Sequence, residues 1–98
     1  MEIEFDDEDL DRLETEPKFT AGFEQPIVRS FRKVMQFLRS AEDERDIYAM
    51  RGLQFKKLKG KRDHERSIRL NQQWRLILEI KEGNPKNILR IMKIEDYH

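Results

Sequence analysis

The chain has 98 residues, of which 41% are charged and 37% are hydrophobic. A chain of this length buries roughly 60–70% of its unfolded surface, which supports one modest core, so we expect a single domain over residues 1–98. The absence of Cys excludes disulfides, thiol nucleophiles and thiolate metal sites, and no run approaches the ~20 apolar residues of a membrane span. The acidic start of the chain has no apolar signal segment, so we expect a cytoplasmic protein without membrane contact.

The net charge of zero conceals a division of charge along the chain. Residues 1–50 hold 14 acidic and 7 basic side chains, a balance of −7, whereas residues 51–98 hold 6 acidic and 13 basic ones, a balance of +7. A basic second half predicts a surface that attracts polyanions, of which nucleic acid is the simplest.

The first half of the chain predicts a short strand and two helices. Residues 1–5 alternate between apolar and acidic side chains, as in a short strand. A first helix is expected from Asp6 or Asp7, whose side chains can cap it, to Pro17, which ends it. A second helix starts at Pro26 and has a basic face that we expect to lie in solvent. Its apolar face carries Ile27, Phe31, Val34, Met35 and Leu38.

The second half predicts strands in close succession. The predicted strands are residues 53–58, 65–70, 74–80 and 87–94. A charged connector at residues 40–46, with room for one helical turn, precedes them, and a turn at residues 82–85 separates the last two. Because the last connections are short, these strands should pair antiparallel. We therefore expect a two-layer α+β domain, in which two N-terminal helices pack on one face of a mostly antiparallel twisted sheet.

Alternation in the predicted hairpin sorts its side chains between the two faces of the sheet. The face toward the core carries Trp74, Leu76, Leu78 and Ile80. Arg75 lies on the opposite face, and Arg69 of the partner strand can join it there. Two guanidiniums on one open face can clasp a phosphate, although Arg75 could instead pair with Glu79.

Four separated blocks in the second half of the chain carry a family resemblance. The blocks are Leu58–Gly60, Arg66–Asn71, Gln73–Leu76 and Glu95–His98. Together they resemble the HigB family of bacterial type II toxins, within the RelE/ParE toxin superfamily. The resemblance implies a microbial-RNase-like fold and a ribosome-dependent mRNA endonuclease that cuts the message in the A site and so inhibits translation. It implies no cofactor and no metal, and no His, Asp or Glu cluster in the sequence has metal-ligand spacing.

The resemblance also implies which residues form the site. The catalytic residues would be Lys59, Arg75, Asp96, Tyr97 and His98. The basic residues expected to bind the RNA backbone are Lys56, Lys57, Lys61, Arg66 and Arg69. We expect Arg75 to stabilise the charge of the phosphorane. His98 and Lys59 would transfer the protons. Tyr97 would orient the substrate or stack on a base. Because some relatives have His where this chain has Lys56, the general base stays open among Lys59, Tyr97 and His98.

The implied partners are a HigA-like helix-turn-helix antitoxin, the ribosomal A site and mRNA. Toxin and antitoxin are expected to form a heterotetramer that binds operator DNA through the antitoxin. Two other functions fit a basic surface of this kind: a ParE-like poison of DNA gyrase, and a non-catalytic module that binds RNA or the ribosome. The Leu58–Gly60 and Asp96–His98 blocks favour the nuclease.

Overall fold

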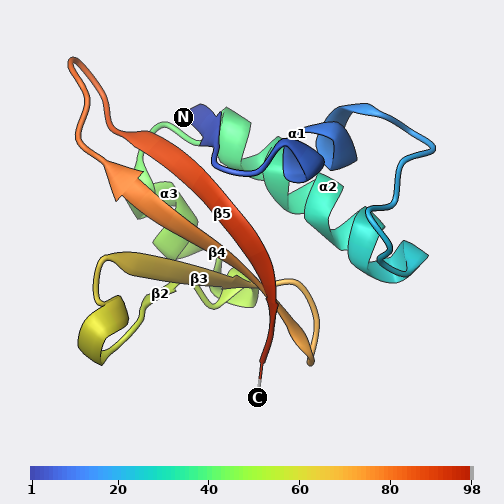
Figure 1. Cartoon of the computed structure of the whole chain (residues 1–98). Helices are drawn as coiled ribbons and strands as arrows, with labels where there is room; N and C mark the ends of the chain where they lie inside the picture. The colour runs from blue at the N-terminus through green and yellow to red at the C-terminus, as the bar shows by residue number, and fades with distance from the viewer. Residues whose placement is uncertain (98) are drawn as a thin grey trace.

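The computed structural model describes residues 1–97, in which three α-helices pack with a twisted sheet (Figure 1). The helices are α1 (Glu8–Thr15), α2 (Gln25–Ser40) and α3 (Glu44–Ala49). The strands are β1 (Glu2–Phe5), β2 (Lys56–Lys57), β3 (Glu65–Arg69), β4 (Trp74–Lys81) and β5 (Ile88–Asp96). Single 3₁₀ turns, η1 (Arg51–Leu53) and η2 (Gly60–Arg62), flank β2. Within this part of the chain, no helix has the length and apolarity to cross a bilayer.

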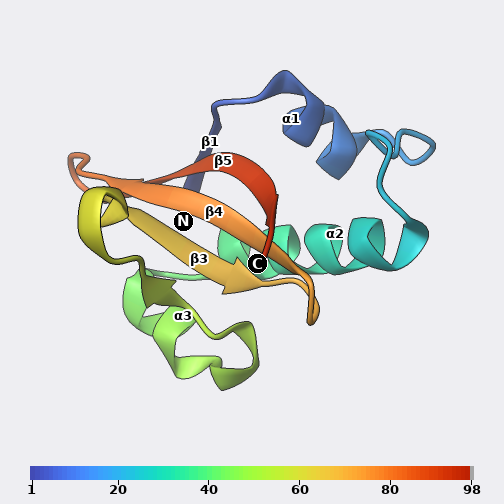
Figure 2. The same ribbon diagram turned by 60° about the horizontal axis from the view of Figure 1, so that its bottom comes forward.

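The five strands form one sheet in the order β1-β5-β4-β3-β2. β1 runs parallel to β5, and every other pair of neighbouring strands is antiparallel. Figure 2 shows how the sheet twists between β5 and β3, as backbone sterics require of neighbouring strands. The predicted α+β fold with a mostly antiparallel sheet is therefore confirmed, and α3 is an additional helix.

Local sequence signals set the bounds of the two N-terminal helices. The Asp7 side chain accepts a hydrogen bond from the Asp9 N–H at 2.8 Å and caps α1, whose first turn is acidic. Pro26 lies in the first turn of α2, where its missing N–H costs no intrahelical bond. Most of the basic face of α2 lies in solvent, as expected, and only Arg32 on that face is partly buried. The Arg32 guanidinium donates to the Leu13 carbonyl at 2.9 Å and ties the end of α1 to α2.

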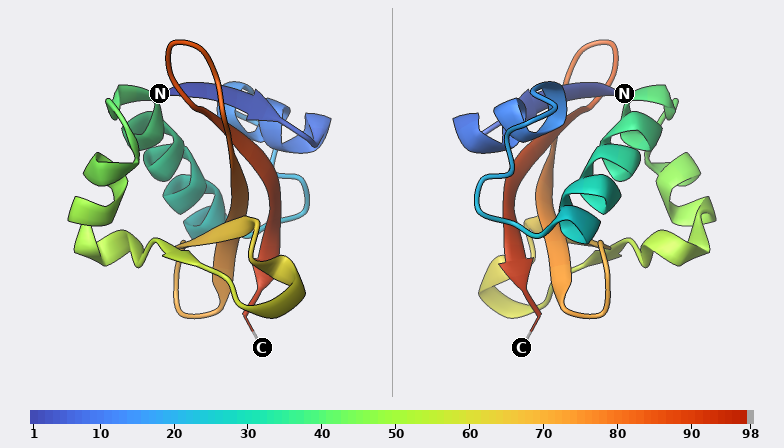
Figure 3. Two further views of the ribbon diagram at one scale, coloured as in Figure 1. Left: turned by 90° about the vertical axis from the view of Figure 1, so that its left-hand side faces the viewer. Right: turned by 90° about the vertical axis from the view of Figure 1, so that its right-hand side faces the viewer.

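The core lies between α2 and one face of the sheet. The buried side chains of α2 are the five predicted ones and Val28. Opposite them, the fully buried strand residues are Ile68, Leu76, Leu78, Leu89 and Ile91. Because burying one such side chain contributes roughly 1.5–3 kcal/mol, this layer supplies most of the stability. Figure 3 shows α2 and α3 on one side of the sheet and the loop that carries η2 on the other.

The predicted strand at residues 53–58 is wrong in its bounds. The chain forms η1 there first, and Gln54 then adopts a left-handed backbone conformation with φ of 48°. This break leaves only the two lysines of β2 to pair with β3. The charged connector also differs from expectation, because it leads into a full helix. The Asp43 side chain accepts from the Arg45 N–H at 2.9 Å and so caps α3.

Candidate active site

A hollow of about 420 Å³ opens on the face of the sheet that α2 does not cover. Its floor is made by alternate residues of β3 and β4, whose neighbours along each strand point into the core. The loop before β3 closes one side, and the end of β5 closes the other. The hollow is lined by Leu58, Arg62, Ser67, Arg75, Ile77, Glu95, Asp96 and Tyr97.

Arg75 is the central cation of this hollow. Strand pairing places it between Arg69 of β3 and Glu95 of β5, and its side chain is buried, with only 8% of the residue exposed. Its Nε and Nη1 atoms have no hydrogen-bond partner from residue 1 to residue 97, so it does not pair with Glu79. A buried guanidinium without an anionic partner is costly in the free protein. This arrangement is suited to an anion supplied by a ligand.

Tyr97 covers that guanidinium. The Arg75 Cζ atom lies 4.2 Å from the centroid of the Tyr97 ring, and the Lys56 Nζ atom lies 5.6 Å from the same centroid. Both distances are in the range of cation–π attraction. The Tyr97 N–H donates to the Gln73 carbonyl at 2.6 Å, which holds the end of β5 against the turn before β4. Residues from β2, β4 and the chain's last segment thereby meet at one aromatic ring.

Arg62 holds the loop and the end of β5 together. Its Nη1 and Nη2 atoms each donate to the Glu95 carboxylate at 3.0 Å, and its Nε donates to Glu65 at 2.5 Å. The hydrogen bonds from Arg62 to Glu95 lower the pKa of the Glu95 carboxyl below its ordinary value, and Lys93 adds to the effect. Glu95 first and Glu65 second raise the pKa of Arg62. Two strands and η2 are thus fixed around the hollow by one bidentate guanidinium.

The other predicted catalytic residues lie around the hollow to different degrees. Asp96 lines it and accepts a hydrogen bond from the Gln73 amide at 3.1 Å. Lys59, at the start of η2, is exposed and adjacent in sequence to Leu58, but it does not line the hollow itself. His98 lies outside the described residues.

The predicted RNA-binding residues do not all lie at the hollow. Lys57 and Lys61 are exposed, on β2 and η2, and Arg66 donates to the Asp63 carbonyl at 3.4 Å. Arg69 stands opposite Arg75 in the strand register but lines a different groove, between α2 and η1. Direct pairing puts Arg69 and Arg75 on the same face of the sheet, as predicted, but only Arg75 lines the hollow. Lys56, whose Nζ atom lies near the Tyr97 ring, is a second cation beside it.

The expectation that no His, Asp or Glu cluster has ligand spacing needs correction. Ligand atoms of His64, Glu65 and Glu79 lie within 4.8 Å of one another, because strand pairing places the two glutamates opposite each other. The sequence spacing alone could not reveal this. The Arg62 guanidinium already neutralises Glu65, which weakens the group as a cation site.

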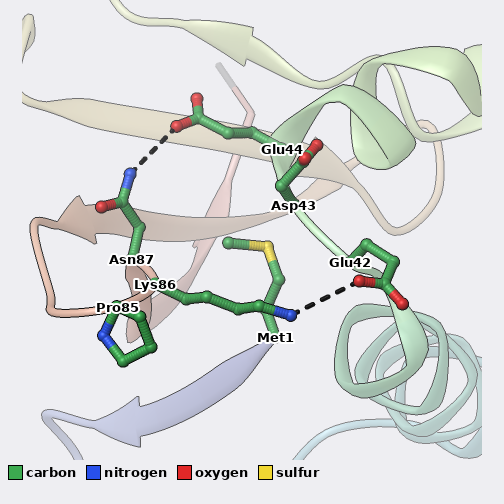
Figure 4. Close-up of a pocket in the computed structure, with 7 residues that line it drawn as sticks. All are labelled: Met1, Glu42, Asp43, Glu44, Pro85, Lys86 and Asn87. Carbon is green, nitrogen blue, oxygen red and sulfur yellow. Dashed lines mark hydrogen bonds and ion pairs between the residues drawn. The ribbon is translucent and has the colours of Figure 1, made fainter.

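A second hollow, near residue 1, differs in its chemistry (Figure 4). It is lined by Met1, Glu42, Asp43, Glu44, Pro85, Lys86 and Asn87. Here the polar side chains contact one another: Lys86 meets Glu42, and Asn87 meets Glu44, both at 3.4 Å. Because these groups are already partnered, this hollow offers a ligand less than the hollow around Arg75 does.

The comparisons with known proteins agree with this fold. The architecture is that of RelE-like toxins of type II toxin–antitoxin systems: over its full length the chain is similar to the whole of a YoeB/ParE toxin from Agrobacterium tumefaciens, with a TM-score of 0.61 and 14% identity. It is also similar to a conserved hypothetical protein from Helicobacter pylori, with a TM-score of 0.54 and 16% identity over 99% of this chain and 94% of that one. No curated protein is significantly similar to this chain in sequence.

The family follows from the sequence match. The family model of HigB-like toxins, described as the RelE-like toxin of the type II toxin–antitoxin system HigB, matches residues 3–97. The chain therefore belongs to the HigB-like toxin family, as its sequence blocks predicted. Membership of a type II toxin family implies an antitoxin partner.

Sequence reasoning missed three polar residues of the hollow. Ser67 alternates with Arg69 on the predicted strand, so the same period that placed Arg69 on the open face could have placed Ser67 there. Arg62 and Glu65 are three residues apart, which hints at a local pair. Nothing in the sequence indicates that Glu95 contacts Arg62, since that contact depends on how β3, β4 and β5 align.

Proposed function

We propose that this protein is a ribosome-dependent mRNA endonuclease that inhibits translation by cutting the message in the A site. The observation that supports this most strongly is the buried Arg75 guanidinium, whose Nε and Nη1 atoms have no partner from residue 1 to residue 97. A phosphodiester is an anion that a buried guanidinium with free N–H donors can bind. Family membership supports the same activity.

The reaction follows from the chemistry of RNA. The 2′-oxygen attacks the adjacent phosphorus, the bond from phosphorus to the 5′-oxygen breaks, and a 2′,3′-cyclic phosphate and a 5′-hydroxyl result. A base takes the 2′-hydroxyl proton, an acid protonates the leaving 5′-oxygen, and a cation stabilises the phosphorane between these steps. This route uses only side chains and calls for no metal ion.

The residues divide these tasks between them. Arg75 stabilises the phosphorane, aided by Lys56, whose Nζ atom also lies near the Tyr97 ring. Lys59, on the loop that Arg62 fixes, and His98 transfer the protons. Tyr97, half exposed, stacks on a base of the substrate once its ring leaves Arg75.

The remaining basic side chains guide the RNA toward the hollow. Lys57 and Lys61 are exposed on β2 and η2, where they attract backbone phosphates without fixing one geometry.

For the antitoxin we propose a helix-turn-helix protein of the HigA type. Together the two would form a heterotetramer that contacts operator DNA through the antitoxin.

Mapping of mRNA 5′ ends in a translating extract tests the proposal. The wild type should create new ends within codons, and Lys59→Ala, Arg75→Ala and a variant lacking His98 should each create far fewer. Lys18→Ala, an exposed lysine of the loop after α1, is the matched control and should cut like the wild type. New ends at undiminished frequency in all three site variants would refute the assignment.

Two outcomes would point to the other functions. Inhibition of gyrase in a supercoiling assay, without new RNA ends, would indicate a ParE-like poison. Salt-sensitive binding to ribosomes or RNA, again without new ends, would indicate a non-catalytic module.

A further inference from the structure

Ser67 is a buried polar residue that the proposed reaction has not yet used. It lies in the middle of β3, opposite Ile77 of β4, and only 2% of its surface is exposed. Its Oγ atom is buried and has no hydrogen-bond partner from residue 1 to residue 97. Buried hydroxyls are nearly always hydrogen-bonded, so an orphaned one calls for an explanation.

Other serines of this chain show what a purely structural hydroxyl does. Ser30 Oγ donates to the Leu70 carbonyl at 2.7 Å, and Ser40 Oγ donates to the Phe37 carbonyl at 2.8 Å. Ser67 differs from both, although it is more buried than either. A role in stabilising the fold therefore does not explain the position of its hydroxyl.

The nearest explanation is the hollow itself. Ser67 and Arg75 both line it from neighbouring strands. Ser67 pairs directly with Ile77, so Arg75, two residues before Ile77, is its diagonal neighbour on the same face. Three buried polar atoms without a hydrogen-bond partner from residue 1 to residue 97 are thus gathered on one floor: Ser67 Oγ, Arg75 Nε and Arg75 Nη1. All three can donate hydrogen bonds, which is the pattern expected for a site that receives an oxyanion.

We propose that Ser67 contacts the substrate, its hydroxyl donating a hydrogen bond to a non-bridging oxygen of the phosphate that Arg75 binds. A phosphate fits better than a carboxylate, because its tetrahedral oxygens can meet donors from two strands at once. The apolar side chains of Leu58 and Ile77 beside these donors suit the ribose that a phosphodiester carries. The assignment of this phosphate to RNA rests on the proposed function.

Access to the floor requires two small motions. The Tyr97 ring covers Arg75, and its side chain is half exposed at the end of the described chain, so rotation of the ring uncovers the guanidinium. The Ser67 hydroxyl turns into the hollow by rotation about χ1, which has three staggered positions. Substrate binding then satisfies donors that the free protein leaves unpaired.

Two serine variants test this inference against a structural role. Ser67→Ala removes an unpaired buried hydroxyl, so its melting temperature should stay equal to that of the wild type or rise. Its kcat for mRNA cleavage should fall about 10–100-fold, the worth of one hydrogen bond to a charged oxygen. Ser30→Ala should do the reverse, with a lower melting temperature and unchanged cleavage. A Ser67→Ala protein that melts earlier and cuts normally would overturn the proposal.

A binding measurement separates this inference from the proposed function. In ¹⁵N-labelled wild-type toxin, inorganic phosphate should shift the Arg75 side-chain Nε–H signal, and Ser67→Ala should need about 10-fold more phosphate for the same shift. This result supports a phosphate-binding site at Ser67 and Arg75 even if no RNA is cut. In that case only the proposed function fails. Equal affinity in the two proteins, or no shift in the wild type, would overturn the role of Ser67.

Discussion

The two faces of the central sheet are both largely buried where β3 and β4 pair, but they differ in chemistry. On the side of α2, Leu76 and Leu78 are fully buried in an apolar core without polar atoms to satisfy. On the side of the hollow, Ser67 and Arg75 are nearly as buried, yet within the described residues they carry polar atoms that lack hydrogen-bond partners. The α2 side therefore stabilises the fold, whereas the hollow side gives up stability so that hydrogen-bond donors stay available to a ligand.

The largest expected effect concerns the α2 side. Leu78→Ala should lower the free energy of unfolding by about 2–5 kcal/mol, because it removes a fully buried side chain and leaves a cavity. Chemical denaturation measures the change, with Lys18→Ala, at an exposed position in the loop after α1, as the control. A loss below about 1 kcal/mol would mean that this layer does not carry the stability assigned to it.

On the hollow side, removing the donors should affect activity and leave stability intact. Arg75→Met keeps the apolar stem of the side chain but removes the guanidinium, so mRNA cleavage should fall about 100–1,000-fold. The free energy of unfolding should stay level or increase, since the lost buried cation has two atoms, Nε and Nη1, without a hydrogen-bond partner from residue 1 to residue 97, which outweighs its contact with the Tyr97 ring. A variant that unfolds more readily and still cuts RNA would reverse the comparison between the two faces.

Arg62 should affect both stability and cleavage, because its hydrogen bonds hold the two sides of the hollow together. Arg62→Gln should reduce cleavage about 10-fold, and a double-mutant cycle with Glu95→Gln should give a coupling energy of about 1 kcal/mol. The solvent-exposed pair of Arg12 and Glu16 is the control, and its coupling should be smaller. Equal coupling in both pairs would remove the special role given to Arg62.

The smallest effect is a dependence of stability on pH. Arg62 lowers the pKa of Glu95 from its ordinary value of 4.5, so the stability contributed by Glu95 is fully present above about pH 4.5 and is lost as the pH falls through its folded pKa. The difference in melting temperature between the wild type and Glu95→Gln should therefore shrink as the pH drops below 4.5. Glu82→Gln, in the β4–β5 turn, controls for the lost charge. A difference that does not change with pH would contradict the contact.

Local patterns predicted much of this molecule from sequence. The alternation of β4 separated Leu76 and Leu78 from Arg75, and the spacing of apolar residues in α2 identified its buried face. Such patterns succeed because strand and helix periods depend on neighbours in the chain. The short extent of β2 was missed, because the left-handed conformation of Gln54 has no clear sequence signal.

Contacts between distant segments could not be predicted in the same way. Arg62 and Glu95 are 33 residues apart, and their contact exists only because η2 and the end of β5 border the same hollow. The ring of Tyr97 over Arg75 likewise depends on the register of β4 and β5. The family resemblance named Tyr97 and Arg75 as site residues, but it carried no information on how close they lie.

The most direct test of the central claim is a structure of the toxin bound to a ribosome whose A-site codon carries 2′-O-methyl groups and cannot be cut. The account predicts the scissile phosphate within hydrogen-bond distance of the Arg75 guanidinium, with the Tyr97 ring moved off it. A phosphate seated in another groove, with Tyr97 still covering Arg75, would contradict the account.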